Sequence, residues 1–391
     1  MGKKIKVGFL SDIDLHDITQ LSGTSYNLRK ILEENGFEVI CIDNLSRGFH
    51  IIDFSQKVFG KIYRKTTGKN YRKDWTWFAT KRFARKVEKR IKTNPPDVIF
   101  SWTTPILANL KTSIPKVLYT DATFNLMLGF YPNFSNFSKK REKKGNKIAK
   151  KAFDNTDLLL FSSDWAADSA ITDYGISPSR VKVLTLGANI EVNHSAARIS
   201  EMISQKPKNE IHLLFIGLDW VRKGGKKAVE VCEDLNRKGY KTWLHIIGTK
   251  PPNEKSLPPF VKVHGFISKA KKEGRDFMNQ IFSQVHYLIL PTYADCTPMV
   301  FAELNAYGIP AITHNVGGIA TIVKNNKNGF IFPINSEPSE ISKKIIETHT
   351  NPGQYEKVAI SSFHTFKENL NWENTGKRLS THIKSLVNNQ A

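Results

Sequence analysis

The chain has 391 residues and a formal net charge of +22, with 58 Lys and Arg against 36 Asp and Glu. This length exceeds one ordinary hydrophobic core and favours two domains of about 190 residues each. Cys41, Cys232 and Cys296 have neither metal-binding spacing nor the pattern of a disulfide framework, which fits a reducing compartment. The opening MGKKIKVGFLSD has too short an apolar run for a signal peptide, and no stretch reaches the roughly 18 apolar residues of a membrane span. We therefore expect a cytoplasmic protein.

The first half of the chain alternates between strand-like and helix-like segments. Strands are expected over 4–10, 38–42, 97–101, 116–120, 157–162 and 181–184. Helices are expected over 22–35, 75–92 and 165–174. The helix 75–92 is basic and amphipathic, and prolines stop it at 95–96. The irregular segment 125–145 is expected to form a surface loop.

A polar stretch without strand signal, 191–209, marks the expected domain boundary, and the alternation then restarts. Strands are expected over 211–216, 241–247, 261–264, 286–290, 311–313 and 330–333. Helices are expected over 226–238, 299–307, 341–349, 353–366 and 372–388. Two such series predict an α/β protein with two doubly wound Rossmann-like domains that face a central cleft. Ligands of such sheets bind beyond the carboxyl ends of the strands.

The segment PTYADCTPMVFAE, residues 291–303, is the most informative part of the chain. It places Asp295 on a loop after a strand and Glu303 in the following helix. The free N–H groups at the start of that helix would face a phosphate, and the two carboxylates could accept hydrogen bonds from hydroxyls. This combination predicts a sugar nucleotide as ligand. The expected helix-start contacts are Thr297 as N-cap, Pro298 as first helical residue, then Met299 and Val300.

Further candidate contacts follow other strands. The turn GLDWVRKGG begins at Gly217 and carries Arg222 and Lys223, whose cations could neutralise charge on a departing diphosphate. Thr249 and Phe266 follow two neighbouring strands, where backbone groups could pair with a nucleobase.

Two candidates lie in the first half. Asp121 follows the strand 116–120 and could bind a hydroxyl or help to take a proton. Gly23 would let the backbone approach a ligand closely. The eleven histidines show no metal-binding spacing, and Asp12-Ile13-Asp14 is interpreted as a turn, so no metal is expected.

Positive charge is concentrated in two runs, from Lys61 to Lys92 and from Lys139 to Lys151. They predict an anionic partner, which could be a membrane surface, a phosphorylated acceptor or nucleic acid. The alternative is that both runs are ordinary solvated faces.

Several of these segments resemble one enzyme family. PTYADCTPMVFAELNAYGIPAITHNVGGIATIV and LLFIGLDWVRKGGKKAVEV resemble the nucleotide-sugar signature of the retaining glycosyltransferases of family 4, which have the GT-B fold. SSDWAADSAITDYGISPSRVKVLTLGANI is similar to the segment that closes that family's N-terminal domain. The resemblance is strong over about 155–335 and weaker over 1–130. It implies an acceptor-binding domain, 1–190, completed by a C-terminal helix, 372–391, and a nucleotide-sugar-binding domain, 195–370.

The resemblance also implies roles for single residues. Glu303 matches the second acid of the family's E-x7-E motif, which holds the ribose. Asp295 matches the first acid, which contacts the donor sugar, although it is one methylene shorter than the usual Glu. Lys223 matches the lysine that binds the donor phosphates, and Arg222 precedes it as in a subset of the family. Leu218 stands where many members carry an Arg.

Asp121 stands where the family often has a His, and Gly23 lies where the family's chain approaches the diphosphate. The implied reaction is transfer of a sugar, from a UDP-sugar as the favoured donor, with retained configuration and without a divalent metal. The departing phosphate would take the proton of the acceptor hydroxyl, stabilised by Arg222, Lys223 and the amides after Thr297.

The sequence leaves the acceptor open. The leading hypothesis is a membrane-associated or phosphorylated acceptor, with the enzyme peripheral on the inner face of a membrane. A small soluble acceptor is the variant of this hypothesis. A basic nucleic-acid-binding protein is a different class, disfavoured because no nucleic-acid module is recognisable. A degenerate transferase that only binds its ligand is the remaining alternative.

Overall fold

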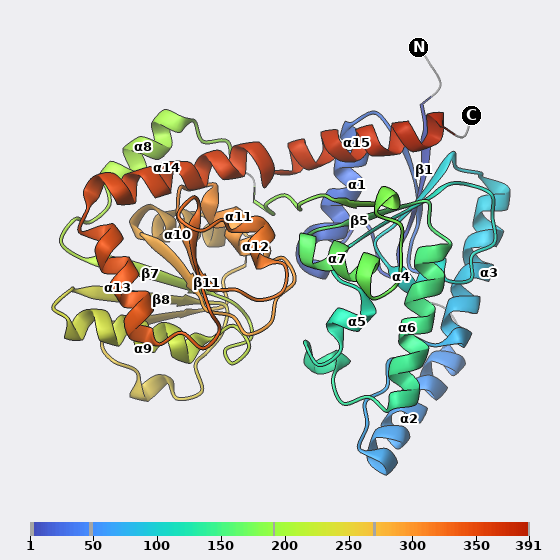
Figure 1. Ribbon diagram of the computed structural model, residues 1–391, viewed down its shortest axis with the longest axis horizontal. Helices are drawn as coiled ribbons and strands as arrows, with labels where there is room; N and C mark the ends of the chain where they lie inside the picture. Colours follow the sequence, from blue (N-terminus) through green and yellow to red (C-terminus); the bar gives the residue numbers. More distant parts are fainter. Residues whose placement is uncertain (1–3, 47–49, 191, 269–270, 390–391) are drawn as a thin grey trace. The chain divides into compact units, whose positions relative to one another are not determined.

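The computed structural model describes residues 4–46, 50–190, 192–268 and 271–389 (Figure 1). The chain divides into two compact units. Unit 1 comprises Met1–Asn189 together with Trp372–Ala391, and unit 2 comprises Ile190–Asn371. Each unit is built around a six-stranded sheet whose paired strands are all parallel. The prediction of two doubly wound Rossmann-like domains is therefore confirmed.

The sheet of unit 1 forms from short apolar runs, most of them buried because helices cover both of its faces. Its strand order is β2-β1-β3-β4-β5-β6. The strands are β1 (Lys6–Leu10), β2 (Glu38–Ile42), β3 (Val98–Ser101), β4 (Lys116–Thr120), β5 (Leu158–Phe161) and β6 (Val181–Val183).

Because the strand order changes direction between β1 and β3, right-handed crossovers place the helices of unit 1 on opposite faces. α1 packs against α15, whereas α3, α4 and α6 share the core on the other face. The helices are α1 (Thr24–Glu34), α2 (His50–Thr67), α3 (Trp77–Thr93), α4 (Thr104–Leu107), α5 (Phe124–Met127), α6 (Lys139–Asp154), α7 (Asp164–Thr172) and α15 (Trp372–Asn388).

Asn189, the last residue of the first segment of unit 1, connects α15 to the loop before α1. Its Oδ1 accepts hydrogen bonds from Trp372 Nε1 and from Asn27 Nδ2, both at 2.8 Å. Its Nδ2 donates to the carbonyl of Ser22. These bonds attach the C-terminal helix to unit 1, although more than 180 residues separate Asn189 from Trp372 along the chain.

Two expectations for unit 1 are wrong. The segment 125–145 is not a continuous surface loop, because residues 139–145 belong to α6 and 124–127 to α5. The many lysines of α6 conceal a buried face that includes Ile148 and Phe153. The helix α2 was also missing from the expected elements. No helix in the described ranges is long and apolar enough to span a bilayer.

The sheet of unit 2 has the order β12-β11-β10-β7-β8-β9. The chain thus starts in the middle of the sheet, moves outward to one side and returns across β7 to β10. This is the strand order of dinucleotide-binding folds, in which the ligand lies where the order reverses. The strands are β7 (Ile211–Ile216), β8 (Thr242–Ile247), β9 (Val261–Gly265), β10 (Tyr287–Leu290), β11 (Ala311–His314) and β12 (Gly329–Phe332).

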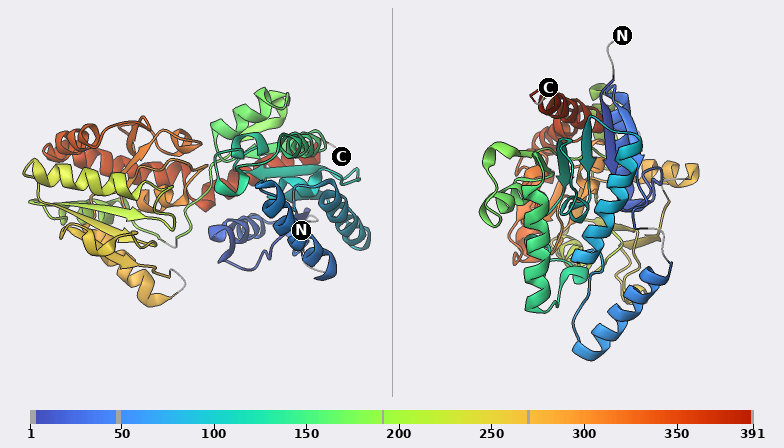
Figure 2. Two further views of the ribbon diagram at one scale, coloured as in Figure 1. Left: turned by 90° about the horizontal axis from the view of Figure 1, so that it is seen from below. Right: turned by 90° about the vertical axis from the view of Figure 1, so that its right-hand side faces the viewer.

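Helices cover both faces of this sheet as well (Figure 2). α9 packs against α13, whereas α14 packs against α8 and α11. The helices are α8 (Ala196–Ser204), α9 (Gly225–Arg237), α10 (Lys272–Gln284), α11 (Met299–Asn305), α12 (Ile319–Ile322), α13 (Pro338–His349) and α14 (Pro352–Asn369). The polar stretch 191–209 includes α8, and α10 was not expected, so both are corrections. Short 3-10 turns span Gln20–Gly23, Pro132–Phe134, Pro178–Arg180 and Glu254–Ser256.

Candidate active site

The turn between β7 and α9 lies directly against the loop that follows β10. Gly224 has a φ of +77°, and a Cβ on it would lie 2.0 Å from the carbonyl oxygen of Pro291. Only glycine accommodates this conformation and this close approach. The carbonyl of Arg222 accepts hydrogen bonds from Tyr293 N at 2.8 Å and from Thr292 Oγ1 at 3.1 Å. The two segments are therefore held together through their backbones.

Asp295 binds both cations of that turn. Its Oδ2 accepts hydrogen bonds from Lys223 Nζ at 2.7 Å and from Thr292 Oγ1 at 2.8 Å, and its Oδ1 accepts from Arg222 Nη1 at 3.1 Å. Arg222 Nη1 also donates to the carbonyl of Ala294 at 2.6 Å. Asp295 is only 7% exposed. Burial lowers the pKa of Lys223, and the adjacent Asp295 carboxylate partly offsets that effect.

This arrangement brings Arg222 and Lys223, which share one turn, together with Asp295 from a second loop. β7 and β10 are neighbours in the sheet, so the loops at their carboxyl ends meet where the strand order reverses. Arg and Lys form charge-assisted hydrogen bonds with carboxylate oxygens and with phosphate oxygens alike. The two cations can therefore release the carboxylate and bind a phosphate in its place. In the structure described here, Asp295 therefore orients both cations.

The start of α11 differs by one residue from the expectation. The helix begins at Met299, Pro298 is its N-cap with a φ of −63° and a ψ of 119°, and Thr297 precedes the cap. Proline suits this position because it has no N–H to leave unpaired. Val300 follows in the first turn. Glu303 lies further along the helix and is 3% exposed, so its carboxylate belongs to the interior of unit 2.

The remaining predicted contacts in unit 2 line the same edge of its sheet. Gly217 N donates to the carbonyl of Ile247 at 3.0 Å, which fixes the end of β7 beside that of β8. Thr249 is buried after β8, whereas Phe266 is 73% exposed after β9. An exposed aromatic ring at the carboxyl edge is available to stack on a planar ligand.

In unit 1, Gly23 and Asp121 lie in loops that follow β1 and β4. Gly23 has a φ of +83°, and Leu21 and Ser22 before it also have left-handed backbones, with φ of 48° and 54°. Three consecutive residues in this region make an uncommon, tightly wound loop. Asp121 is largely surrounded by protein, and burial raises the pKa of its carboxyl group.

Asp12 is a residue that the sequence reasoning assigned only to a turn. It follows β1, at the point where the strand order of unit 1 reverses, and accepts a hydrogen bond at 2.8 Å from Thr103 Oγ1 after β3. Burial raises the pKa of Asp12, and the Thr103 hydroxyl partly offsets this. The signal in the sequence was an acid two positions after the end of the first buried strand.

One group in the described part of the chain has a geometry compatible with a metal ion. Ligand atoms of Asp14, His16 and Asp43 lie within 4.8 Å of one another. The carboxylates already organise the loop, because Asp43 Oδ2 accepts from Leu15 N at 3.2 Å and Asp14 Oδ1 accepts from His16 N at 2.9 Å. This group belongs to unit 1, whereas Arg222, Lys223, Asp295 and Glu303 belong to unit 2.

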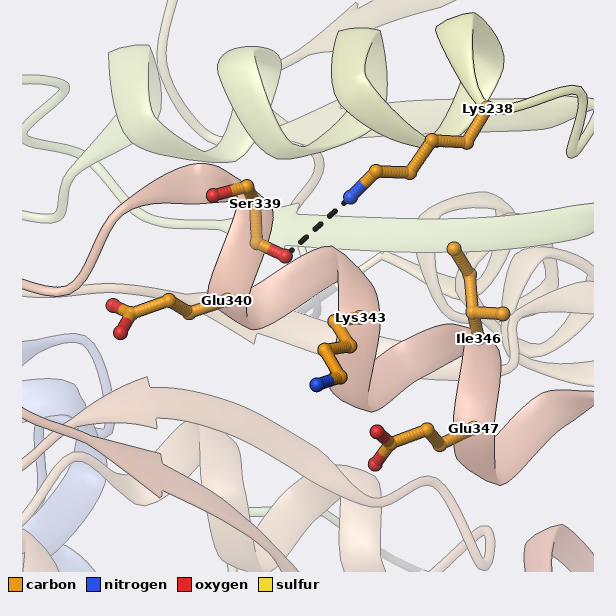
Figure 3. A pocket seen from close by; sticks show the side chains of 6 residues that line it. All are labelled: Lys238, Ser339, Glu340, Lys343, Ile346 and Glu347. Carbon is orange, nitrogen blue, oxygen red and sulfur yellow. Dashed lines mark hydrogen bonds between the residues drawn. The ribbon is translucent and has the colours of Figure 1, made fainter.

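A surface pocket of about 510 Å³ lies between α9 and α13 of unit 2 (Figure 3). α9 returns the chain to the amino ends of the strands, so Lys238 after its last turn is at the opposite edge from Arg222. Lys238 Nζ donates to Ser342 Oγ at 3.0 Å. The pocket contains none of the predicted site residues. Its lining residues are Lys238, Ser339, Glu340, Lys343, Ile346 and Glu347.

Comparison with known protein families matches both halves of the chain. Residues 24–192 match the model described as Glycosyltransferase Family 4, and residues 198–362 match the model described as Glycosyl transferases group 1. A curated relative, the D-inositol 3-phosphate glycosyltransferase of Rhodococcus jostii, is 20% identical over 237 residues, which is 57% of this chain and 51% of that protein. The matches to the first curated relatives span 51% to 62% of their own lengths.

Solved structures with the same fold cover nearly the whole chain. A glycosyltransferase from Rickettsia africae superposes with a TM-score of 0.67 at 15% identity, covering 99% of each chain. HepE from Anabaena, solved in complex with UDP and glucose, superposes with a TM-score of 0.59 at 16% identity, covering 97% of this chain and 100% of that one. Together with the two parallel sheets, these matches show that the chain belongs to the family 4 glycosyltransferases and has the GT-B fold.

Proposed function

We propose that this glycosyltransferase moves a hexose from a nucleotide-diphosphate sugar, with a UDP-sugar as the favoured donor, to a hydroxyl acceptor. The observation that carries the proposal is the cluster of Arg222, Lys223 and Asp295 where the strand order of unit 2 reverses. Two cations held by one buried carboxylate form a preorganised site for a diphosphate. The relative HepE, whose structure contains UDP and glucose, supports the choice of UDP.

In this proposal the side chains that bind the donor come from unit 2, and the backbone at Gly23 is the proposed contribution of unit 1. Arg222 and Lys223 bind the diphosphate, and the N–H groups of the α11 start assist them. Glu303 accepts hydrogen bonds from the ribose hydroxyls. When the donor phosphates bind Arg222 and Lys223, Asp295 either stays bound to these cations or rotates to contact the donor sugar. Phe266 and the backbone at Thr249 face the nucleobase.

The proposed reaction retains the anomeric configuration. The bond between the anomeric carbon and the phosphate oxygen breaks, and the acceptor oxygen bonds to the same face of that carbon. The departing phosphate takes the acceptor's proton. Arg222 and Lys223 stabilise the charge that develops on the phosphate, so we propose that no divalent metal is required. Determining the anomeric configuration of the product by NMR, and measuring turnover in EDTA, test these two statements.

The acceptor is proposed to bind at the carboxyl edge of the sheet in unit 1, where Asp12 and Asp121 lie. Both acids have a raised pKa because of burial, and a carboxyl oxygen can accept a hydrogen bond from an acceptor hydroxyl. We propose that the acceptor is membrane-associated or phosphorylated, since the positive charge is concentrated in unit 1, and that the enzyme is peripheral to a membrane.

A thermal-shift panel of UDP-, GDP- and ADP-sugars tests the donor site. A stabilising donor should raise the melting temperature, and Glu303→Gln should remove most of that shift because it loses the charged acceptor of the ribose hydroxyls. Glu273→Gln, at an exposed position on α10, is the matched control and should leave the shift unchanged. Absence of stabilisation by every nucleotide sugar would contradict the proposal.

A further inference from the structure

The outward side of α2 carries apolar side chains that unit 1 does not cover. Phe54 is 68% exposed, Ile62 is 55% exposed and Val58, halfway between them, is 36% exposed. Residues four apart lie above one another on a helix, so these three side chains form one stripe. A helix of a globular protein normally turns such a stripe toward the core. The exposed stripe of α2 therefore needs a different explanation.

The opposite side of α2 is the one that packs on the protein. Tyr63 Oη donates to Ser138 Oγ at 3.1 Å, and the guanidinium of Arg141 lies 4.5 Å from the centre of the Tyr63 ring. A Cβ on Gly60 would lie 3.1 Å from the ring of Tyr71. These contacts fix the rotation of α2 about its axis, so the stripe faces away from unit 1. Figures 1 and 2 show α2 extending from the body of the unit.

The surroundings of the stripe are strongly basic. Residues 54–73 contain seven Lys and Arg and no Asp or Glu. α6 begins beside α2, as the bond between Tyr63 and Ser138 shows, and adds further cations. The exposed cations of α2 and the following turn are Lys61, Arg64, Lys65 and Lys69, and those of the first two turns of α6 are Lys139, Lys140, Lys143 and Lys144.

The basic amphipathic helix that the sequence predicts, α3, does not expose an apolar stripe of this kind. Most apolar side chains of α3, including Phe83, Val87 and Ile91, are buried in the core of unit 1, whereas Phe78 near its start is 53% exposed. α3 therefore presents mainly its charged side to solvent. The exposed apolar stripe of α2 begins before the basic run from Lys61 to Lys92 and reaches into its first residues at Ile62. It does not lie on the amphipathic helix that periodicity selects.

We propose that the outward face of α2 inserts into the interface of an anionic lipid bilayer. An apolar stripe lined by lysines is the pattern of helices that lie in the plane of a membrane, with the stripe among the acyl chains and the cations at the headgroups. A second copy of this chain is a poorer occupant, because its own α2 would bring the same positive charges against these.

The position of α2 indicates what membrane insertion would achieve, and this step rests on the proposed function. α2 follows the carboxyl end of β2, and α6 begins after the carboxyl end of β4, so both start at the edge of the sheet that holds Asp12 and Asp121. Arg72 and Asp74, between α2 and α3, lie close enough to Asp12 to influence its pKa. The inserted helix would thus place the acceptor edge of unit 1 next to membrane-borne hydroxyls.

Flotation of the full chain with lipid vesicles tests the proposal. The chain should float with vesicles of phosphatidylcholine and phosphatidylglycerol, and much less with phosphatidylcholine alone. The double variant Phe54→Ser/Ile62→Ser should weaken binding by roughly tenfold or more, because two exposed side chains no longer enter the acyl region. Lys61→Ser/Lys65→Ser should weaken binding by about tenfold and reduce its dependence on salt.

Ile334→Ser is the matched control, since Ile334 is a 45% exposed aliphatic side chain on unit 2. A tryptophan at position 54, introduced as Phe54→Trp, should be quenched by lipids brominated on their acyl chains. Equal flotation of the control and the α2 double variant would overturn the proposal, as would a self-association that only Phe54→Ser/Ile62→Ser abolishes. The donor thermal-shift panel does not depend on lipid, so failure of vesicle binding and failure of the proposed function are distinguishable.

Discussion

Asp295 is the residue on which the geometry of the candidate site depends. It is the carboxylate that binds Lys223, and it shares Arg222 with Asp219, which lies 3.4 Å from the guanidinium and is 43% exposed. A buried ion pair contributes modestly as a whole, but removing one partner leaves the other buried without its counter-charge. The two acids around Arg222 therefore differ in what their loss should cost.

We expect Asp295→Asn to lower the free energy of unfolding by roughly 2–3 kcal/mol, because Lys223 remains largely buried without its carboxylate. Asp219→Asn should cost less than about 1 kcal/mol, since its contact is exposed and screened by water. Urea denaturation of both variants, followed by intrinsic fluorescence, measures the difference. Equal losses of unfolding free energy in the two variants would mean that the Asp295 contacts do not stabilise the loop more than those of Asp219.

Asp121 should affect turnover more than donor binding, because it lies in unit 1 while the side chains proposed to bind the donor lie in unit 2. We expect Asp121→Asn to reduce kcat by about 100-fold or more, the usual effect of losing a proton-transferring or hydroxyl-orienting group. The donor-induced thermal shift should stay as in the native chain. Asp168→Asn, at an exposed position on α7, is the control. Loss of the donor shift in Asp121→Asn would instead assign this acid to the donor.

At the scale of elements, α6 depends on a glycine that periodicity does not reveal. A Cβ on Gly145 would lie 2.0 Å from Phe124 Cζ, so α6 crosses α5 at a distance that only glycine permits. Phe124 also packs against Trp75 and Phe137, which leaves its ring little room to move. The missing side chain at position 145 is therefore a packing requirement.

Gly145→Ala should destabilise the chain by about 1–3 kcal/mol, the typical cost of overpacking a filled core. Gly353→Ala is the control, because its Cβ would meet only Asn351 Oδ1 at 3.8 Å and alanine favours the helix. The melting temperatures of the two variants should move in opposite directions. A neutral Gly145→Ala would indicate that α5 shifts readily away from α6.

At the scale of the whole molecule, unit 2 contains a row of stacked histidines that crosses three strands. His212 Nδ1 lies 3.0 Å from His245 Nε2, and His245 Nδ1 lies 3.1 Å from His264 Nε2. Burial, together with the nearby His212, His264 and Lys262, lowers the pKa of His245 to about 3. Glu210 contacts the other end of the row through His212 Nε2 at 2.9 Å.

Two further histidines, His286 and His349, lie at ring contact distance from each other in the same unit. Burial lowers the pKa of both, and the buried Lys206, whose own pKa falls to about 7, adds to the effect on His286. The folded state therefore keeps these imidazoles neutral while the unfolded chain binds protons from about pH 6.5 downward.

The destabilisation caused by these histidines should therefore be absent above about pH 6.5 and should grow as the pH falls toward the folded-state pKa of each histidine. The expected slope is up to about 1.4 kcal/mol per pH unit for each histidine that remains neutral. Urea denaturation between about pH 7 and about pH 5 measures it. His245→Gln should reduce the slope, whereas His364→Gln, at an exposed position of α14, should not. An unchanged slope in His245→Gln would show that other groups cause the acid sensitivity.

Much of this architecture follows from local patterns. The buried strands were expected within one or two residues of their observed bounds, because an unbroken apolar run of four to six residues indicates burial on both sides. The longer helices that were missed, α2, α6, α8 and α10, are those whose apolar residues are diluted by charged or polar ones or lie on the outside. The helices α4, α5 and α12 were also missed, because four residues are too few to show a period. Periodicity reports how apolar a face is and leaves open what that face contacts.

The sequence by itself determined two series of alternating strands and helices, and with them two parallel-sheet units and the loops that carry Arg222, Lys223, Asp295 and Glu303. Only the tertiary structure decided that β7 and β10 are neighbours, which brings Lys223 Nζ to 2.7 Å from Asp295. It also decided that α3 buries its apolar face while α2 exposes one. The physical reason is that local sequence sets the burial of each segment, whereas strand order and helix orientation depend on packing between segments far apart in the chain.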